Sequence, residues 1–219
     1  IRRTPLHHKL AEHHACFGEV SGWERANWFL PADEVKAGKM PEYDYQWGRQ
    51  NWFPAWEAEH RAAREGAALF DLSSFAKFQV EGPDAEAVMQ RISAADMAVP
   101  PGRVVYTQWL NRHGGIEADL TVTRLAEDRY MVVTAAATAI KDFDWLRRLA
   151  GESRVTITDI SSTLATLSLM GPKSRDLLAA VTDADLSNDA FPFATMREID
   201  LGYATVRAGR MTYVGELGW

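Results

Sequence analysis

Cysteine is nearly absent from this sequence. The single thiol, Cys16, cannot close a disulfide within the chain, and no CxxC pair exists for zinc binding or thiol redox chemistry. This scarcity predicts a protein of a reducing compartment whose fold rests on a packed core, and it gives thiol catalysis no support.

A long apolar run and an excess of basic residues are also missing. No apolar run approaches the roughly 20 residues that span a bilayer, and no signal-peptide core is present. The formal net charge is −6 and the basic residues are scattered, so we expect neither a nucleic-acid partner nor a membrane partner. Together with 47% hydrophobic residues, these features predict a globular cytoplasmic protein, with the mitochondrial matrix as the alternative compartment.

A start methionine is lacking too. The chain opens with Ile-Arg-Arg-Thr-Pro and stops at Trp219 within the turn-rich stretch YVGELGW. We therefore expect it to be a piece of a longer protein.

Tryptophan, in contrast, is abundant in residues 1–55, in the stretches SGWERANWFLP, YDYQWGRQ and NWFPAW. Prolines and glycines interrupt these stretches, a pattern typical of irregular structure that large aromatic rings fix to a core. The only regular element we predict there is a short helix near residues 5–14.

A first α+β unit is predicted over about 56–150. Its expected elements are a helix at 56–66 that ends at Gly66, a strand at 76–80 with alternating apolar residues, a helix capped by Asp84 and ending near 92, strands at 103–110, 116–124 and 130–135, and a helix at 138–149.

A second α+β unit is predicted over about 151–219. Its expected elements are strands at 154–159 and 164–170, a helix begun by Gly171-Pro172, and short strands at 195–200, 203–208 and 211–214. The predicted fold class is α+β, with antiparallel sheets and helices packed on one side.

One carboxylate, Asp119, lies in the middle of a predicted strand. Alternation places it on the polar face, which by itself is typical of a strand face open to water. A four-residue loop at 111–114 would set Tyr106 directly opposite Asp119, so that the phenol and the carboxylate share one face. We take this register as a hypothesis, because a slip of one residue would separate the two side chains.

Four histidines near the start, His7, His8, His13 and His14, suggest a metal site only at first sight. Adjacent imidazoles on a helix diverge, and no HExxH pattern or carboxylate partner frames them. A solvated helix is the better interpretation, and we predict no metal site.

Several ordered motifs resemble those of the folate-binding aminomethyltransferase family. That family includes the glycine cleavage aminomethyltransferase and the C-terminal half of FAD-dependent dimethylglycine and sarcosine dehydrogenases. The motifs are TPLHHKL (4–10), GWE (22–24), EHRAAREGAALFDLSSFAKFQVEGPDA (59–85), YTQWLNRHGGIEADLTV (106–122), LSLMGPKSRDLL (167–178) and YVGELGW (213–219). The stretches GWERANWF and YTQWLN resemble the flavin-linked dehydrogenases more than the stand-alone transferase.

The resemblance implies a three-lobed ring around a tetrahydrofolate site. This chain would supply the first two lobes of a folate-binding domain spanning 1–219 and stop before the third, a small C-terminal barrel. In the flavin-linked members an FAD domain precedes a segment similar to this one, so FAD is expected in an upstream domain of the same parent chain.

The resemblance also implies roles for four positions. Asp119 matches the catalytic acid beside the reactive nitrogens of tetrahydrofolate, and Glu216 matches the acid that binds the pterin ring. Tyr106 and Val133 match positions that line the folate pocket. Two positions depart from the stand-alone transferases, Ala118 before the acid and Ala135 in place of an asparagine. The loss of the asparagine disfavours a lipoyl-carrier partner.

The function implied is transfer of a one-carbon unit, from an iminium derived from a methylated glycine, to tetrahydrofolate. The fragment alone is expected to bind folate without completing a turnover. Two alternatives remain: a stand-alone glycine cleavage aminomethyltransferase, and a non-catalytic folate-binding module of the same fold.

Overall fold

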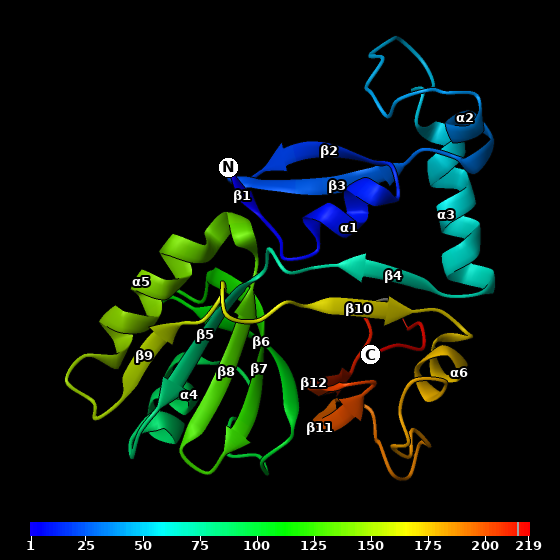
Figure 1. Ribbon diagram of the computed structural model, residues 1–219. Helices are drawn as coiled ribbons and strands as arrows, with labels where there is room; N and C mark the ends of the chain where they lie inside the picture. The colour runs from blue at the N-terminus through cyan, green and yellow to red at the C-terminus, as the bar shows by residue number, and fades with distance from the viewer. Residues whose placement is uncertain (214) are drawn as a thin grey trace.

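A computed structural model describes residues 1–213 and 215–219 of the chain. Its largest element is a five-stranded sheet in the order β6-β7-β8-β5-β9, in which every neighbouring pair is antiparallel (Figure 1). The strands are β5 (Ala76–Glu81), β6 (Val104–Leu110), β7 (Ile116–Ala126), β8 (Arg129–Thr134) and β9 (Thr156–Asp159).

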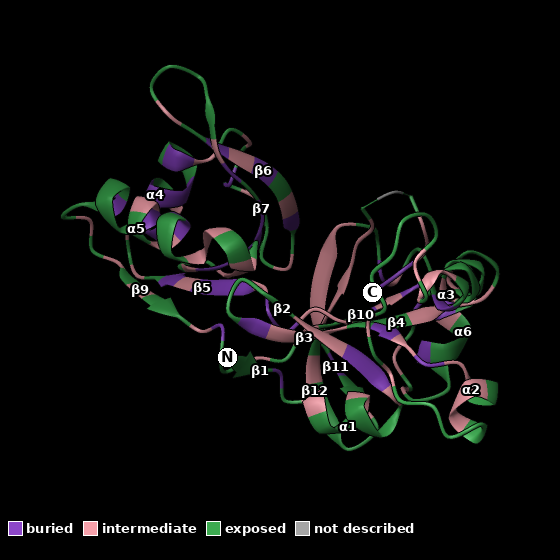
Figure 2. Cartoon of the chain, turned by 90° about the horizontal axis from the view of Figure 1, so that it is seen from above, coloured by how far each residue is buried: buried purple, intermediate pink, exposed green. Residues whose placement is uncertain are grey.

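Helices cover one face of this sheet. They are α4 (Ala85–Ile92) and α5 (Ala139–Ala150), the latter preceded by a short 3₁₀ turn at Ala136–Thr138. Phe78, Leu120 and Val132 are buried against Val88 and Leu146 in one apolar core. Figure 2 shows the buried residues of both helices and of β5 concentrated where these layers meet. The predicted class, α+β with helices on one side of antiparallel sheets, is confirmed.

The N-terminal third is more regular than predicted. The expected helix is present as α1 (His7–Glu12), but β1 (Arg2–Arg3), β2 (Ala15–Val20) and β3 (Trp23–Phe29) form a small sheet in the order β1-β3-β2. The prediction of irregular structure is therefore wrong for these strands. It holds better after α2 (Ala32–Lys36), where Tyr43 and Trp52 pack against the buried Trp28.

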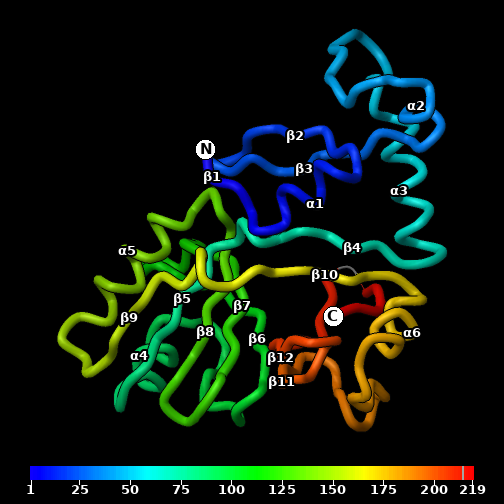
Figure 3. The backbone as a smooth tube through the Cα atoms, in the orientation of Figure 1, coloured from blue at the N-terminus to red at the C-terminus, as the bar shows by residue number. Residues whose placement is uncertain are grey.

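A pair of antiparallel strands joins the two halves of the chain. The predicted helix is present as α3 (Phe53–Glu65), and β4 (Ala68–Asp71) follows it and pairs with β10 (Leu167–Met170), as Figure 3 shows in the middle of the molecule. The turn after β10 approaches the end of α3 closely. A Cβ atom on Gly171 would lie 2.5 Å from the carbonyl oxygen of Gly66, so only glycine fits there.

The second unit differs from its prediction at both ends. The strand expected at its start, β9, pairs with β5 and so belongs to the five-stranded sheet. The helix α6 (Ser174–Ala179) and the hairpin of β11 (Thr195–Leu201) and β12 (Ala204–Arg210) are present as expected. No strand is assigned to residues 211–213, where a further one was predicted, and position 214 lies outside the described residues.

Asp84 precedes α4 as predicted, but its side chain does not cap the helix. The carboxylate instead binds Arg154 across the sheet edge, with Oδ1 2.7 Å from Nη2 and Oδ2 accepting the Arg154 backbone N–H at 2.8 Å. These hydrogen bonds lower the pKa of Asp84 to about 2, from an ordinary value of 3.8. The contact joins the start of α4 to the loop before β9.

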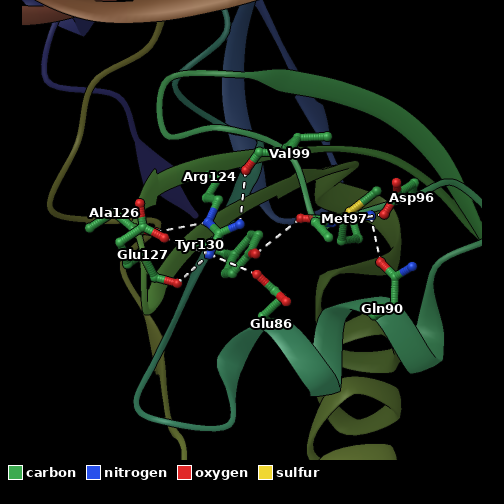
Figure 4. A network of polar contacts seen from close by, with 10 residues as sticks. Glu86, Gln90, Asp96, Met97, Val99, Arg124, Ala126, Glu127 and Tyr130 are labelled. Atoms are coloured by element: carbon green, nitrogen blue, oxygen red, sulfur yellow. Dashed lines mark hydrogen bonds and ion pairs between the residues drawn. The ribbon is translucent and has the colours of Figure 1, made fainter.

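Arg124 on β7 binds the loop that leads into β6 (Figure 4). The guanidinium donates to the carbonyl oxygen of Val99 at 2.9 Å and to that of Glu127 at 2.7 Å, and it lies 2.8 Å from a carboxylate oxygen of Glu86. Its side chain is only 8% exposed. Beneath it, the Tyr130 hydroxyl donates to the Met97 carbonyl oxygen at 3.0 Å. Residues 97–99 are thereby held at the edge of the sheet.

The Asp84–Arg154 pair predicts a specific pH dependence. Because folding lowers the pKa of Asp84, the pair stabilises the protein above the ordinary pKa and is lost as pH falls toward about 2. Asp84→Asn should therefore show a smaller decrease in melting temperature than the wild type between about pH 5 and about pH 2. The control Asp144→Asn, in an exposed pair with Arg148, should keep the wild-type profile, and parallel profiles for wild type and Asp84→Asn would contradict the assignment.

Loss of the Arg124 guanidinium should be costly because several partly buried acceptors would lose their donor and the buried side chain that supplies it. Arg124→Met is expected to lower the free energy of unfolding by about 3 kcal/mol, measured by urea denaturation. Arg112→Met, in the exposed β6–β7 turn, is the matched control and should change it by less than about 0.5 kcal/mol. Equal urea midpoints for the two variants would show that Arg124 has no such role.

Candidate functional site

A row of four side chains crosses the sheet on the face away from the helices. Strand register pairs Tyr106 with Thr121, Thr121 with Val133, and Val133 with Lys77. Residues paired across neighbouring strands share a face, so these four side chains point the same way. Their alternating neighbours, such as Phe78 and Leu120, form the helix-covered core.

A cavity of about 450 Å³ lies over this row. Its floor includes Lys77, Thr121 and Val133 of the sheet. Its other walls come from the segment 164–170, the β11–β12 hairpin, and the C-terminal residues Met211, Tyr213 and Trp219. The part of this sheet face around Thr121 and Thr123 is therefore covered by protein, and both residues are buried. This volume is in the range of pockets that take small molecules and cofactors.

A second hollow, an apolar crevice of about 390 Å³, adjoins the cavity. Val104, Thr121 and Met211 line both spaces. Tyr106 lines the crevice, which continues past Phe193 to Arg103 at the base of the hairpin. The cavity thus lies over one face of the sheet, and the crevice adjoins it at the β6 edge, where Val105 and Tyr106 from opposite faces of the strand both line it.

Asp119 is exposed on β7, at the open end of this site. Asp119 pairs with Gln108, not with Tyr106 as predicted. The loop between the two strands is one residue longer than expected, and the register shifts by one more residue between Trp109 and Leu110. The two extra residues shift the register by two, and a shift of two keeps the face unchanged. The hypothesis that Tyr106 and Asp119 share one face is therefore confirmed, although the predicted pairing is wrong.

The two side chains also interact. The Asp119 carboxylate raises the pKa of the neighbouring Tyr106 phenol. Gln108 donates a hydrogen bond to the same carboxylate, with Nε2 3.2 Å from Asp119 Oδ1. Asp119 is thus a carboxylate with a phenol and an amide donor beside it at the surface of the sheet.

The C-terminal segment brings Glu216 to the same region. The Tyr213 backbone N–H donates to Glu216 Oε1 at 3.3 Å. The Tyr213 side chain lines the cavity, and its pKa is raised by partial burial of the hydroxyl and by the nearby Asp119 carboxylate. Tyr213 therefore connects the turn that carries Glu216 with Asp119.

The predicted residues occupy different parts of the site. Val133 lies on the cavity floor and Tyr106 in the crevice wall, whereas Asp119 lines neither hollow and stands beside Tyr106. Neither Lys77 nor Tyr213 was predicted from the sequence as a site residue. The Lys77 residue is 2% exposed, its Nζ donates to the carbonyl oxygens of Ser73 and Phe75, and burial lowers its pKa. Period-two alternation placed Lys77 on a solvent face, whereas segments far away in the sequence, which the strand pattern cannot locate, bury it.

The described residues gather no group of three histidine, cysteine, aspartate or glutamate side chains suited to a metal ion. His7 instead stacks on Phe17, with ring centroids 4.1 Å apart, and its Nε2 lies 2.8 Å from Glu24. Within the same residues, no helix is both long and apolar enough to cross a bilayer.

Comparison with known proteins finds relatives that match the whole chain. A 4-methylaminobutanoate oxidase (formaldehyde-forming) of Paenarthrobacter nicotinovorans is 47% identical over 219 residues, which are 100% of this chain and 26% of the relative. A mitochondrial sarcosine dehydrogenase of Mus musculus is 37% identical over 253 residues, covering 100% of this chain and 28% of the relative. The chain thus spans about a quarter of the length of these curated relatives.

The fold is also found among solved structures. The crystal structure of the glycine cleavage system aminomethyltransferase T from Bartonella henselae matches with a TM-score of 0.76 and 27% identity, covering 99% of this chain and 52% of that one. The family model described as the GCVT N-terminal domain matches residues 6–219. The chain belongs to the GCVT N-terminal domain family of aminomethyltransferases.

Proposed function

We propose that this chain is the tetrahydrofolate-binding part of an enzyme that oxidises an N-methylated amino acid and passes the one-carbon unit to folate. The observation that carries the proposal is the placement of two acids, Asp119 and Glu216, next to a cavity with a partly apolar lining. Such a combination suits a flat heteroaromatic ring with a polar edge.

The residues present fit a reduced pterin. Its amino and ring nitrogens offer a row of N–H donors, and a carboxylate such as that of Glu216 can accept two of them side by side. Val133 and Met131 on the cavity floor offer apolar surface for the face of the ring. Glu216 would therefore hold and orient the pterin, and Val133 would support it.

Bound tetrahydrofolate supplies a nucleophilic nitrogen for the one-carbon unit. Asp119 is the residue that this chain offers to stabilise the cationic carbon donor and to accept the proton that leaves the attacking nitrogen. The hydrogen bond from Gln108 fixes the position of its carboxylate, and the Tyr106 phenol lies beside it. Tyr106 is a positioning residue for this step as well as part of the wall.

The names of the relatives favour an oxidative parent enzyme. The oxidase and the sarcosine dehydrogenase both act, by name, on N-methylated amino acids. We infer that an FAD domain elsewhere in the same parent chain generates the iminium and that this part receives its one-carbon unit. The alternative of a stand-alone glycine cleavage aminomethyltransferase is supported by the Bartonella structure and disfavoured by Ala135.

Folate binding is tested by calorimetric titration of this chain with 5-formyl-tetrahydrofolate. Glu216→Gln should weaken binding on the order of 10- to 100-fold, because one charge-assisted pair of hydrogen bonds is lost. The exposed Glu152→Gln is the control and should bind like the wild type. Unchanged affinity in Glu216→Gln would remove Glu216 from the pterin site.

The catalytic assignment is tested in the longer parent enzyme. Asp119→Asn should leave the rate of amine oxidation unchanged and reduce transfer to tetrahydrofolate on the order of 100-fold or more, with formaldehyde released instead. Asp144→Asn on the outer face of α5, a surface carboxylate far from the row of Tyr106 and Val133, is the matched control. Undiminished transfer in Asp119→Asn would favour the non-catalytic folate-binding module.

A further inference from the structure

The segment between α2 and α3, residues 37–52, exposes large apolar side chains. Figures 1 and 3 show this aromatic loop projecting beyond the small N-terminal sheet. Trp47 is 102% exposed, and Tyr45 and Met40 are 76% and 73% exposed. Apolar side chains scattered singly over a surface are ordinary, but several so close together in one projecting loop indicate a binding surface.

The aromatic loop is preorganised by its own hydrogen bonds. Asn51 closes its base, because Nδ2 donates to the carbonyl oxygen of Glu42 at 2.8 Å. On either side of Trp47, Gln50 Nε2 donates to the carbonyl oxygen of Gln46 at 2.6 Å, and Gln50 Oε1 accepts the Gln46 backbone N–H at 3.3 Å. Trp47 is therefore presented by a fixed turn, which reduces the conformational entropy that binding would cost.

Stacked rings attach the aromatic loop to the body of the protein. Tyr45 stacks on Tyr43 with ring centroids 5.4 Å apart, and both meet Trp52 edge-on, at 5.8 and 5.1 Å. Tyr43 packs in turn against the buried Trp28. In contrast, the Trp47 side chain makes no hydrogen bond or ring contact with residues 1–213 or 215–219. It is the ring that this cluster leaves free for a partner.

The size and charge of the loop indicate what kind of partner it fits. Aromatic side chains bury roughly 150–250 Å² each, so the loop supplies about 500 Å², less than the roughly 800 Å² per partner of a stable complex between separate molecules. A partner tethered in the same chain needs less area, because tethering raises its effective concentration. Lys39 and Arg49 balance Glu42 and Asp44, so the loop lacks the basic excess that favours an anionic membrane.

We propose that the aromatic loop, with Trp47 as its anchor, docks in an apolar pocket on the flavin-bearing part of the same parent chain. The matched segment is 26% of the oxidase and 28% of the sarcosine dehydrogenase, so about three quarters of such a chain lie outside it. The inference rests on the proposed function, which assigns amine oxidation to that outer part. None of residues 37–52, all of which the structure describes, lines the cavity, so docking is separate from the pterin and one-carbon roles.

The test places the photoreactive amino acid p-benzoyl-phenylalanine at Trp47 of the full-length parent enzyme. The control places it at Tyr203, which is also fully exposed. Mixing isotope-labelled with unlabelled enzyme separates adducts within one chain from adducts between copies. We expect cross-links from Trp47 to peptides of the flavin-bearing part of the same chain. Adducts to a second copy, adducts confined to these 219 residues, or no excess over the Tyr203 control would each overturn the inference.

Truncation of the anchor gives a second measurement in the same enzyme. Trp47→Ala should lower the temperature at which the parent releases its flavin by roughly 2 °C, and Tyr203→Ala should leave it unchanged. Because Trp47 is fully exposed, its truncation should not disturb the fold of its own segment. Equal release temperatures for wild type and Trp47→Ala would contradict the anchor role. A parent that cross-links as expected but does not bind 5-formyl-tetrahydrofolate would support docking and overturn the proposed folate function.

Discussion

The pleat of the five-stranded sheet is the constraint on which the rest of the structure depends. Successive side chains of a strand leave on opposite faces, so when Phe78 and Leu120 pack against α4 and α5, their neighbours Lys77 and Thr121 must face the other way. That second face carries the polar side chains of Lys77, Thr121 and Thr123 beside the apolar Met131 and Val133. The β11–β12 hairpin, β10 and the C-terminal segment cover part of it, and the cavity is the space left between them.

The alternation of residues along each strand correctly predicted which side chains share a face of the sheet. Alternation placed Asp119 and Tyr106 on one face, and that survived a register error of two residues because the strand period is two. The error came from the Asn111 turn. There the Asn111 N–H donates to the Gly115 carbonyl oxygen, which closes a loop one residue longer than the Gly-Gly pair suggested. The bulge that follows adds the second residue and has no marker in the sequence.

Long-range contacts explain what could not be predicted. Lys77 carries the signature of a solvent-facing strand residue, and its burial depends on chain more than 80 residues away, where Ser161 accepts its backbone N–H. The strand β9 was assigned to the second unit because chain order suggested it, whereas its pairing with β5 decides its sheet. Which segment covers a sheet face or pairs with an edge strand depends on contacts between residues far apart in the sequence. A local window of the sequence does not contain that information.

Opposite charges at the two ends of the site give it a direction. The acids Glu216 and Asp119 lie near Tyr213 of the C-terminal segment, while the exposed Arg103 lines the adjoining crevice. A ligand with N–H donors at one end and carboxylates at the other would be attracted in one orientation and repelled in the reverse one, since its carboxylates would then meet Glu216. Unequal ends of this kind select an orientation before any close contact forms.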